Sequence, residues 1–198
     1  MSNITKEAVM DLREKTGAGL IDCKRALAET NGDMEEAISN LRKKGVASAA
    51  KKAGREAGEG IISNAVSGDR KKGILVEVNC ETDFVAKNED FISFSKEVAQ
   101  TILVEPEADL ESKRTEQVGK IGENIKISRS QTVEIETNGI VESYVHTGAK
   151  VAVMISILSS KDEDLSSNDT VVSLAKDLCM HIAATSPVCV SRDDVPSD

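Results

Sequence analysis

The residues most suited to chemistry stand at a turn between a predicted strand and a predicted helix. Thr82, Asp83, Phe84 and Val85 follow a strand that ends near Asn79, so a carboxylate and an aromatic ring are neighbours on a corner of the chain. An apolar side chain held on a rigid corner beside an acid is suited to insertion into another protein. These four residues are the predicted partner-binding site.

Two simpler interpretations of this corner stay open from the residues alone. Phe84 could pack into the chain's own core, and Asp83 could cap local backbone groups. Residues 159–162 occupy the same place in a later, similar pattern and include no aromatic residue. That difference weakens an architectural need for the ring and favours an outward-pointing Phe84.

The sequence lacks the motifs of common enzymes. It has no nucleophile elbow, phosphate-binding loop, dinucleotide-binding glycine pattern or H-E-x-x-H motif. Its two histidines are far apart, and we expect neither to be a catalytic base. The four cysteines occur singly, so we expect no metal, cofactor or disulfide framework. A cysteine-dependent enzyme using Cys80 is an alternative, although the acidic neighbour Glu81 opposes a thiolate there.

The charge and composition exclude several functions. The 198 residues carry 25 Lys and Arg against 34 Asp and Glu, a net charge of −9, so we expect no direct binding of nucleic acid or anionic membranes. Aromatic residues make up 2% of the chain, too few for base stacking. No long apolar run or secretory N-terminus is present, which predicts a cytoplasmic protein. The acidic excess lies in residues 81–198, with 11 basic and 22 acidic side chains.

The first 45 residues predict a compact three-helix module. Thr5 and Asp33 are suited to capping the first and third helices, and Asn31-Gly32 to ending the second. So small a module buries little surface, so Leu20 and Ile21 could face a partner instead of packing inside the module. Residues 46–59 have little to pack and are predicted as a linker that is partly helical.

From Gly60 onward a hairpin followed by a helix occurs twice, about 79 residues apart. This repeat predicts two related α+β subdomains, at residues 60–138 and 139–198. The Asn138-Gly139 pair predicts a tight hairpin turn. A third strand reaching Thr137 completes the first copy, whereas the second copy stops about a dozen residues after its helix, so we expect it to be incomplete.

Several of these segments together resemble translation elongation factor Ts, the guanine-nucleotide exchange factor of elongation factor Tu. The resemblance runs from residue 4 to residue 196, and its motifs are residues 16–27, 79–86, 120–125 and 144–148. It implies a ubiquitin-associated-like helical module, a linker and two related core subdomains. Bacterial members usually continue beyond the point that matches Val195-Pro196, so the resemblance implies a missing C-terminal part.

The resemblance also implies a mechanism that uses no enzyme chemistry. Phe84 would wedge between two helices of the partner's G domain, and Asp83 would help to shift one of them, disturbing the magnesium and nucleotide site. Secondary contacts are implied for Leu20, Ile21, Ile121, Gly122 and His146. A homodimer or a 2:2 complex is compatible with it. The alternative from another class is a helical interaction adaptor that has no effect on nucleotide exchange.

Overall fold

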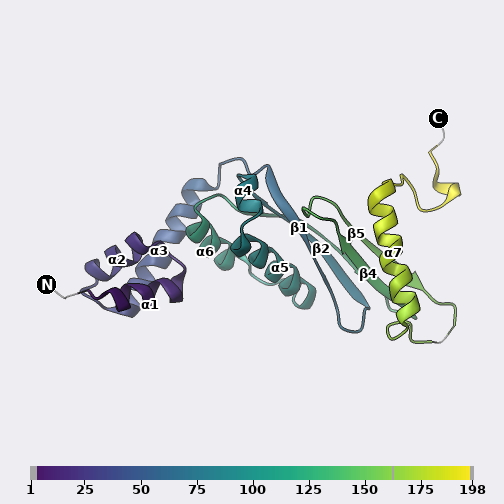
Figure 1. The fold of residues 1–198 in the computed structure, drawn as a ribbon, viewed down its shortest axis with the longest axis horizontal. Coiled ribbons are helices and arrows are strands. Elements are labelled where there is room, and N and C mark those ends of the chain that lie inside the picture. The colour runs from purple at the N-terminus through teal and green to yellow at the C-terminus, as the bar shows by residue number, and fades with distance from the viewer. Residues whose placement is uncertain (1–3, 162, 197–198) are drawn as a thin grey trace. The chain divides into compact units, whose positions relative to one another are not determined.

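The computed structural model describes residues 4–161 and 163–196. It has the expected α+β composition, with three N-terminal helices followed by strands and helices (Figure 1). Residues 1–3, 162 and 197–198, which fall within the first and last predicted domains, lie outside the described residues. Contacts divide the chain into two compact units. The first contains the chain up to Glu59, Asn79–Phe91 and Asp109–Ile127; the second contains Gly60–Val78, Ile92–Ala108 and the chain from Ser128 onward.

The three N-terminal helices share a small core within the first compact unit (Figure 1). They are α1 (Lys6–Thr16), α2 (Leu20–Glu29) and α3 (Met34–Lys52). The predicted caps are confirmed: Thr5 accepts a hydrogen bond from the Ala8 N–H at 3.1 Å, and Asp33 accepts one from the Glu36 N–H at 2.9 Å. Leu12 and Leu27 are fully buried between the helices, which gives the module its hydrophobic centre.

The segment that follows the three-helix module packs more closely than expected. Residues 46–59 are predicted as a partly helical linker with little to pack. The helical part is confirmed, since α3 continues to Lys52, but α3 also packs against α6 (Glu111–Ile121). A Cβ added to Gly119 of α6 would lie 3.4 Å from the Cα of Gly45 in α3. Since small residues bring two helix axes close together, this segment packs without large apolar side chains.

The corner that carries the predicted site directly follows the second strand of the first sheet. Its strands are β1 (Glu59–Val66), β2 (Lys72–Cys80) and β3 (Lys126–Glu134), in the order β1-β2-β3. Burial alternates along β2, as the two-residue period of a strand requires, and Val76, Val78 and Cys80 are buried. Two helices follow β2: α4 (Asp83–Ala86) and α5 (Glu89–Val104). Asn88 caps α5, accepting a hydrogen bond from the Asp90 N–H at 2.9 Å.

The second hairpin and its helix lie in the second compact unit. Strands β4 (Gly139–Val145) and β5 (Ala152–Leu158) pair antiparallel, with Gly139 opposite Leu158. Helix α7 (Asp169–Thr185) packs on both strands (Figure 1), and Ile140, Leu165 and Ala175 form the buried centre of this arrangement. A short 3₁₀ helix, η1 (Arg192–Asp194), follows.

The predicted hairpin turn at Asn138-Gly139 is wrong. These residues join β3 in the first sheet to β4 in the second, and neither has the positive φ that the favoured two-residue turn needs. Gly139 instead allows close strand pairing, because an added Cβ would lie 2.3 Å from the carbonyl oxygen of Ile157. The glycine is required by the approach of β5.

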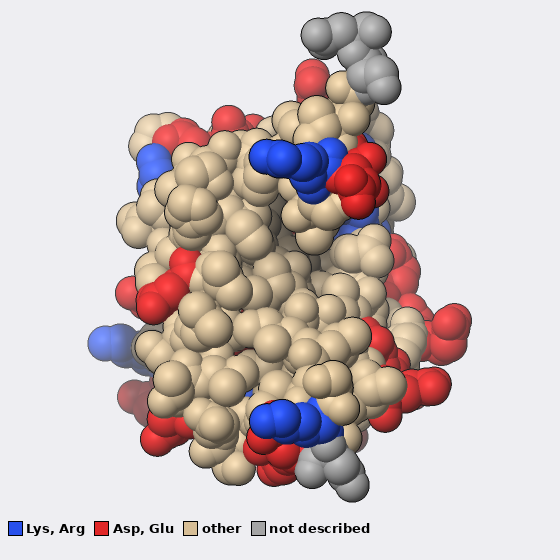
Figure 2. Space-filling model, turned by 90° about the vertical axis from the view of Figure 1, so that its right-hand side faces the viewer, with Lys and Arg blue, Asp and Glu red and all other residues tan. Residues whose placement is uncertain are grey.

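The outer face of α7 is poor in charge. Figure 2 shows, on the side that carries α7 and the C-terminal segment, a broad uncharged surface with charged groups mainly toward its rim. Leu174, Leu178 and Met180 of α7 are exposed. In the part of the chain that the structure describes, β5 pairs with β4 alone, so its other edge is open. None of the described helices is long and apolar enough to cross a membrane.

Candidate protein-binding site

The predicted site, at the turn expected after the strand, forms a single turn of helix. Helix α4 begins directly after β2, and Thr82 is its N-cap, with its hydroxyl accepting a hydrogen bond from the Val85 N–H at 3.3 Å. Thr82 is therefore the N-cap of the turn, and Asp83 lies in its first turn, where the Lys87 side chain and the backbone N–H groups of Asp83 and Phe84 contribute to the lowered pKa of its carboxyl. The turn gives the four site residues a fixed backbone.

Phe84 points away from the protein. Its side chain is 82% exposed, whereas Ala86 of the same turn is buried. The alternative of a ring packed in the chain's own core is therefore wrong. Exposing so large an apolar side chain is unfavourable unless something else covers it, so the ring is a candidate anchor for another protein.

The Asp83 carboxylate is held beside the ring by a local ion pair. Lys87, four residues later, donates a hydrogen bond to Asp83 Oδ2 at 2.8 Å. This hydrogen bond holds the pKa of the Asp83 carboxyl below its ordinary value of 3.8. Asp83 is thus ionised at neutral pH and presents a negative charge next to Phe84.

Glu123 holds the base of the helical turn. One oxygen of its carboxylate accepts hydrogen bonds from the N–H groups of Glu81 and Thr82, both at 3.0 Å, and the other accepts one from the Thr82 hydroxyl at 2.7 Å. In return, the Glu81 carboxylate accepts a hydrogen bond from the Asn124 N–H at 2.6 Å. Sequence reasoning did not select Glu81 or Glu123, although both lie within the motifs that carried the family resemblance.

The predicted secondary residues Ile121 and Gly122 directly precede this carboxylate. Ile121 is half-buried at the end of α6, and Gly122 ends the helix with a φ of 85° and donates a hydrogen bond to the Val118 carbonyl. Only glycine adopts that conformation readily. The hydrogen bonds of Glu123 therefore bring Ile121 and Gly122 to the base of the turn that carries Phe84.

The other predicted secondary residues are also on the surface. Leu20 and Ile21 begin α2 and are 47% and 74% exposed, so the alternative that places both in the module's core is wrong. His146 is exposed at the end of β4, where its Nδ1 lies 2.9 Å from the Tyr144 hydroxyl. Leu20 and Ile21 belong to the first compact unit and His146 to the second.

Catalytic and metal-binding alternatives find little support among the described residues. No three His, Cys, Asp or Glu side chains there are placed to hold a metal ion. Cys80 is fully buried, so its thiol is not accessible to a substrate, and the thiol donates a hydrogen bond to the Thr82 carbonyl at 3.2 Å. The burial of Cys80 therefore argues against the cysteine-enzyme alternative.

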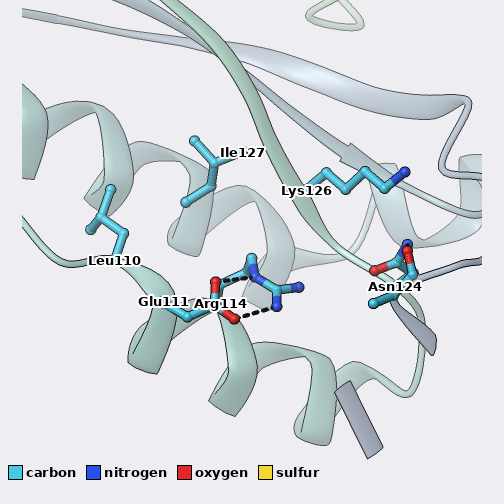
Figure 3. Close-up of a pocket in the computed structure, with 7 residues that line it drawn as sticks. Leu110, Glu111, Arg114, Asn124, Lys126 and Ile127 are labelled. Carbon is cyan, nitrogen blue, oxygen red and sulfur yellow. Dashed lines mark hydrogen bonds and ion pairs between the residues drawn. The ribbon is translucent and has the colours of Figure 1, made fainter. Parts of the chain in front are cut away.

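One pocket of the first compact unit has a charged lining (Figure 3). Arg114 and Lys126 contribute positive charge, but the guanidinium of Arg114 donates to both oxygens of Glu111, at 2.5 and 2.8 Å, and to the Ile125 carbonyl at 2.8 Å. These bonds fasten the chain after α6 to the helix. Because the guanidinium is already used in this way, the pocket is a poor candidate for a ligand site.

An exposed ring and acid on a fixed corner are typical of a module that acts by binding another protein. The family described as Elongation factor TS matches residues 81–198. The chain is 44% identical over 209 residues to the elongation factor Ts of Clostridium perfringens (strain SM101 / Type A), an alignment that covers 98% of this chain and 67% of the relative. It is 48% identical over 205 residues to that of Photorhabdus laumondii, covering 100% and 68%. The chain belongs to the elongation factor Ts family, whose members are nucleotide exchange factors for elongation factor Tu and not enzymes.

Proposed function

We propose that this chain binds elongation factor Tu with GDP and promotes release of the nucleotide by inserting Phe84 into the partner's G domain. The observation that carries this proposal is the 82% exposure of a phenylalanine on a one-turn helix whose base is hydrogen-bonded to the body of the protein. The ring would displace a helix of the partner's G domain, and the ionised Asp83 beside it would compete for the polar contacts that this helix makes. Neither residue performs a chemical step.

The displaced helix would disturb the site of the partner's magnesium ion. Mg²⁺ requires nearly ideal octahedral coordination by oxygen and bridges protein and phosphate groups. A small shift of the segment that supports the ion therefore weakens the binding of the diphosphate. Because coupling between two ligands is reciprocal, returning nucleotide in turn expels the exchange factor.

A single anchor is not sufficient for the expected effect. Accelerating release by about 10³ to 10⁵ requires lowering the barrier by roughly 4 to 7 kcal/mol. One aromatic anchor contributes about 2 to 4 kcal/mol. The remainder would come from the secondary contacts that we propose for Leu20 and Ile21 on α2, Ile121 and Gly122 after α6, and His146 after β4.

Phe84→Ala tests this mechanism. Because the ring is exposed, its removal should leave the fold intact, while the rate of stimulated GDP release should fall by roughly 30-fold or more. The measurement is the release of a fluorescent GDP analogue from purified elongation factor Tu in the presence of Mg²⁺. The matched control is Val104→Ala, which truncates a different exposed apolar side chain, on α5. With this variant, the partner should release GDP at the rate seen with the wild-type chain.

The same experiment separates the adaptor alternative. A helical adaptor would bind the partner through α2 without changing nucleotide release, so neither the wild-type chain nor Phe84→Ala would stimulate release. Calorimetry measures binding to the partner directly, and it distinguishes an adaptor that binds without stimulating release from a chain that does not bind at all. An unchanged release rate with Phe84→Ala in an otherwise active chain would refute the wedge.

We also propose the domain organisation that the family resemblance implied, in a cytoplasmic protein. Residues 1–45 would form a ubiquitin-associated-like module, 46–59 a connecting segment, and 60–138 and 139–198 two related core subdomains, the second incomplete. The partial exposure of Leu20 and Ile21 supports the use of the module in binding.

Self-association would use the uncharged face of α7. A chain of net charge −9 repels its copies, so two copies approach most easily across a surface with few charges (Figure 2). A homodimer, or a 2:2 complex with the partner, would result. Light scattering during size-exclusion chromatography measures the mass; Leu178→Glu should shift a dimer toward monomer, and a monomeric wild-type chain at high concentration would refute this proposal.

A further inference from the structure

The exposed ring of Phe84 has little of its own to hold it in place. Its side chain is 82% exposed, and α4, from which it projects, is only four residues long. A helix of that length is not stable by itself, because nucleation costs more than one turn of hydrogen bonds returns. The direction of the ring must therefore be set by whatever holds the first residues of α4.

Those first residues are held chiefly by one carboxylate. Glu123 accepts hydrogen bonds from the N–H groups of Glu81 and Thr82 and from the Thr82 hydroxyl, so it fixes both the backbone and the side chain of the N-cap. Charge-assisted hydrogen bonds of this kind are stronger than bonds between neutral groups. The contact joins segments about 40 residues apart in sequence and lies entirely within the first compact unit.

A second carboxylate makes the connection reciprocal. Glu81 accepts a hydrogen bond from the Asn124 N–H at 2.6 Å and lies 3.5 Å from the Arg55 guanidinium. Asn124 is itself buried and donates to the Arg55 carbonyl at 2.8 Å. The turn after α6 and the corner before α4 thus each contribute a carboxylate that accepts hydrogen bonds from backbone N–H groups of the other. We call Glu81 and Glu123, with the N–H groups that they bind, the carboxylate clamp.

We propose that Glu123 is a positioning residue for nucleotide exchange: through the carboxylate clamp it orients Phe84 and couples it rigidly to Ile121 and Gly122. This inference rests on the proposed function and adds a residue that does not touch the nucleotide. A wedge must be stiff to push a partner's helix, since a ring that turns freely on its base loses its alignment with the partner. Misplacing a reacting or binding group by about 1 Å can cost a large factor in rate.

The test compares three substitutions at Glu123 in the full chain. Glu123→Ala removes all the acceptors. Glu123→Asp keeps the charge but withdraws the carboxylate by about 1.5 Å, the length of one carbon–carbon bond. Glu123→Gln keeps an acceptor oxygen at full reach, and its amide can donate to the Thr82 hydroxyl. Glu116→Ala removes an exposed carboxylate from α6, one that pairs with Lys120, and is the matched control.

Release of fluorescent GDP from elongation factor Tu is measured over a range of exchange-factor concentrations. Glu123→Ala and Glu123→Asp should lower the maximal rate roughly tenfold, while the half-saturating concentration changes less than about threefold, because the other contacts still bind. Glu123→Gln should stay within about threefold of the wild-type maximal rate, and Glu116→Ala should match the wild type. A wild-type maximal rate for Glu123→Asp would overturn the proposal.

A double mutant separates positioning from a general structural role. If Glu123 acts only through the ring, Glu123→Ala combined with Phe84→Ala should be no slower than Phe84→Ala alone, whereas independent effects would multiply. Multiplying effects would overturn the inference while leaving the wedge mechanism intact. A Phe84→Ala variant with the wild-type rate would instead refute the proposed function. Thermal unfolding identifies any variant that fails to fold. If Glu123→Ala does not fold, the comparison of the folded Glu123→Asp and Glu123→Gln variants tests the proposal.

Discussion

At the scale of single residues, the corner combines two side chains with opposite requirements. Phe84 lies in water although it is apolar, and Glu123 is half-buried although it is charged. The hydrogen bonds that Glu123 accepts compensate for its partial removal from water. No contact within the described part of the chain compensates in the same way for the ring, which is 82% exposed. The imbalance at Phe84 is what a binding partner would remove.

The pair of Asp83 and Lys87 gives a pH prediction. Since the folded pKa of Asp83 is below 3.8, the pair stabilises the corner fully above about pH 4, and this contribution is lost as the pH falls through the folded pKa. Lys87→Gln should move the titration midpoint of Asp83 up toward 3.8, as followed by carboxyl-carbon NMR. Lys96→Gln, an exposed substitution on α5, should leave the midpoint in place; an unmoved midpoint in Lys87→Gln would contradict the ion pair.

At the scale of the elements, the sequence predicts what local patterns determine. Alternating apolar residues identify β2, and the cap residues Thr5 and Asp33 begin helices as expected. The packing of the end of α3 and the connection at Asn138-Gly139 were mispredicted because both depend on distant contacts. Gly45 packs against Gly119, and Gly139 against Ile157, and no local pattern reveals those partners.

A glycine in β2 provides a stability test at this scale. A Cβ added to Gly73 would lie 2.8 Å from both Met154 Sδ and Val141 Cγ1. Gly73→Ala should therefore lower the free energy of unfolding by about 1 to 3 kcal/mol, measured by urea denaturation. Gly68→Ala, in the turn after β1, meets no atom within 4 Å and should change it by less than about 0.5 kcal/mol. If the two substitutions lowered the free energy of unfolding equally, close packing around Gly73 would not be the cause of the destabilisation.

At the scale of the whole molecule, the candidate site was only partly predictable. The motif of Thr82 to Val85 was evident because an aromatic residue beside an acid on a turn is unusual. The carboxylate clamp could not be predicted, since Glu81 and Glu123 come together only when the turn after α6 returns to the end of β2. Composition excluded whole classes of function but not the partner, which the family comparison supplied.

The cysteines give a prediction for the intact molecule. Three are buried, and only Cys189 is partly exposed. Burial also raises the pKa of Cys179 to about 11, so this thiol stays protonated at neutral pH. Iodoacetamide at about pH 8 should modify Cys189 first, as followed by mass spectrometry of peptides, without loss of exchange activity. Early labelling of Cys80 with parallel loss of activity would revive the cysteine-dependent alternative.

The path of the backbone between the two compact units limits how the protein can be divided. Strand β2 changes unit between Val78 and Asn79, and helix α5 changes unit between Phe91 and Ile92, each within a continuous element. A nick at any one of these points would leave each fragment with only part of a unit. We therefore expect that limited proteolysis yields no fragment that corresponds to one complete unit, and that grafting one unit onto another protein requires joining several separate pieces of chain.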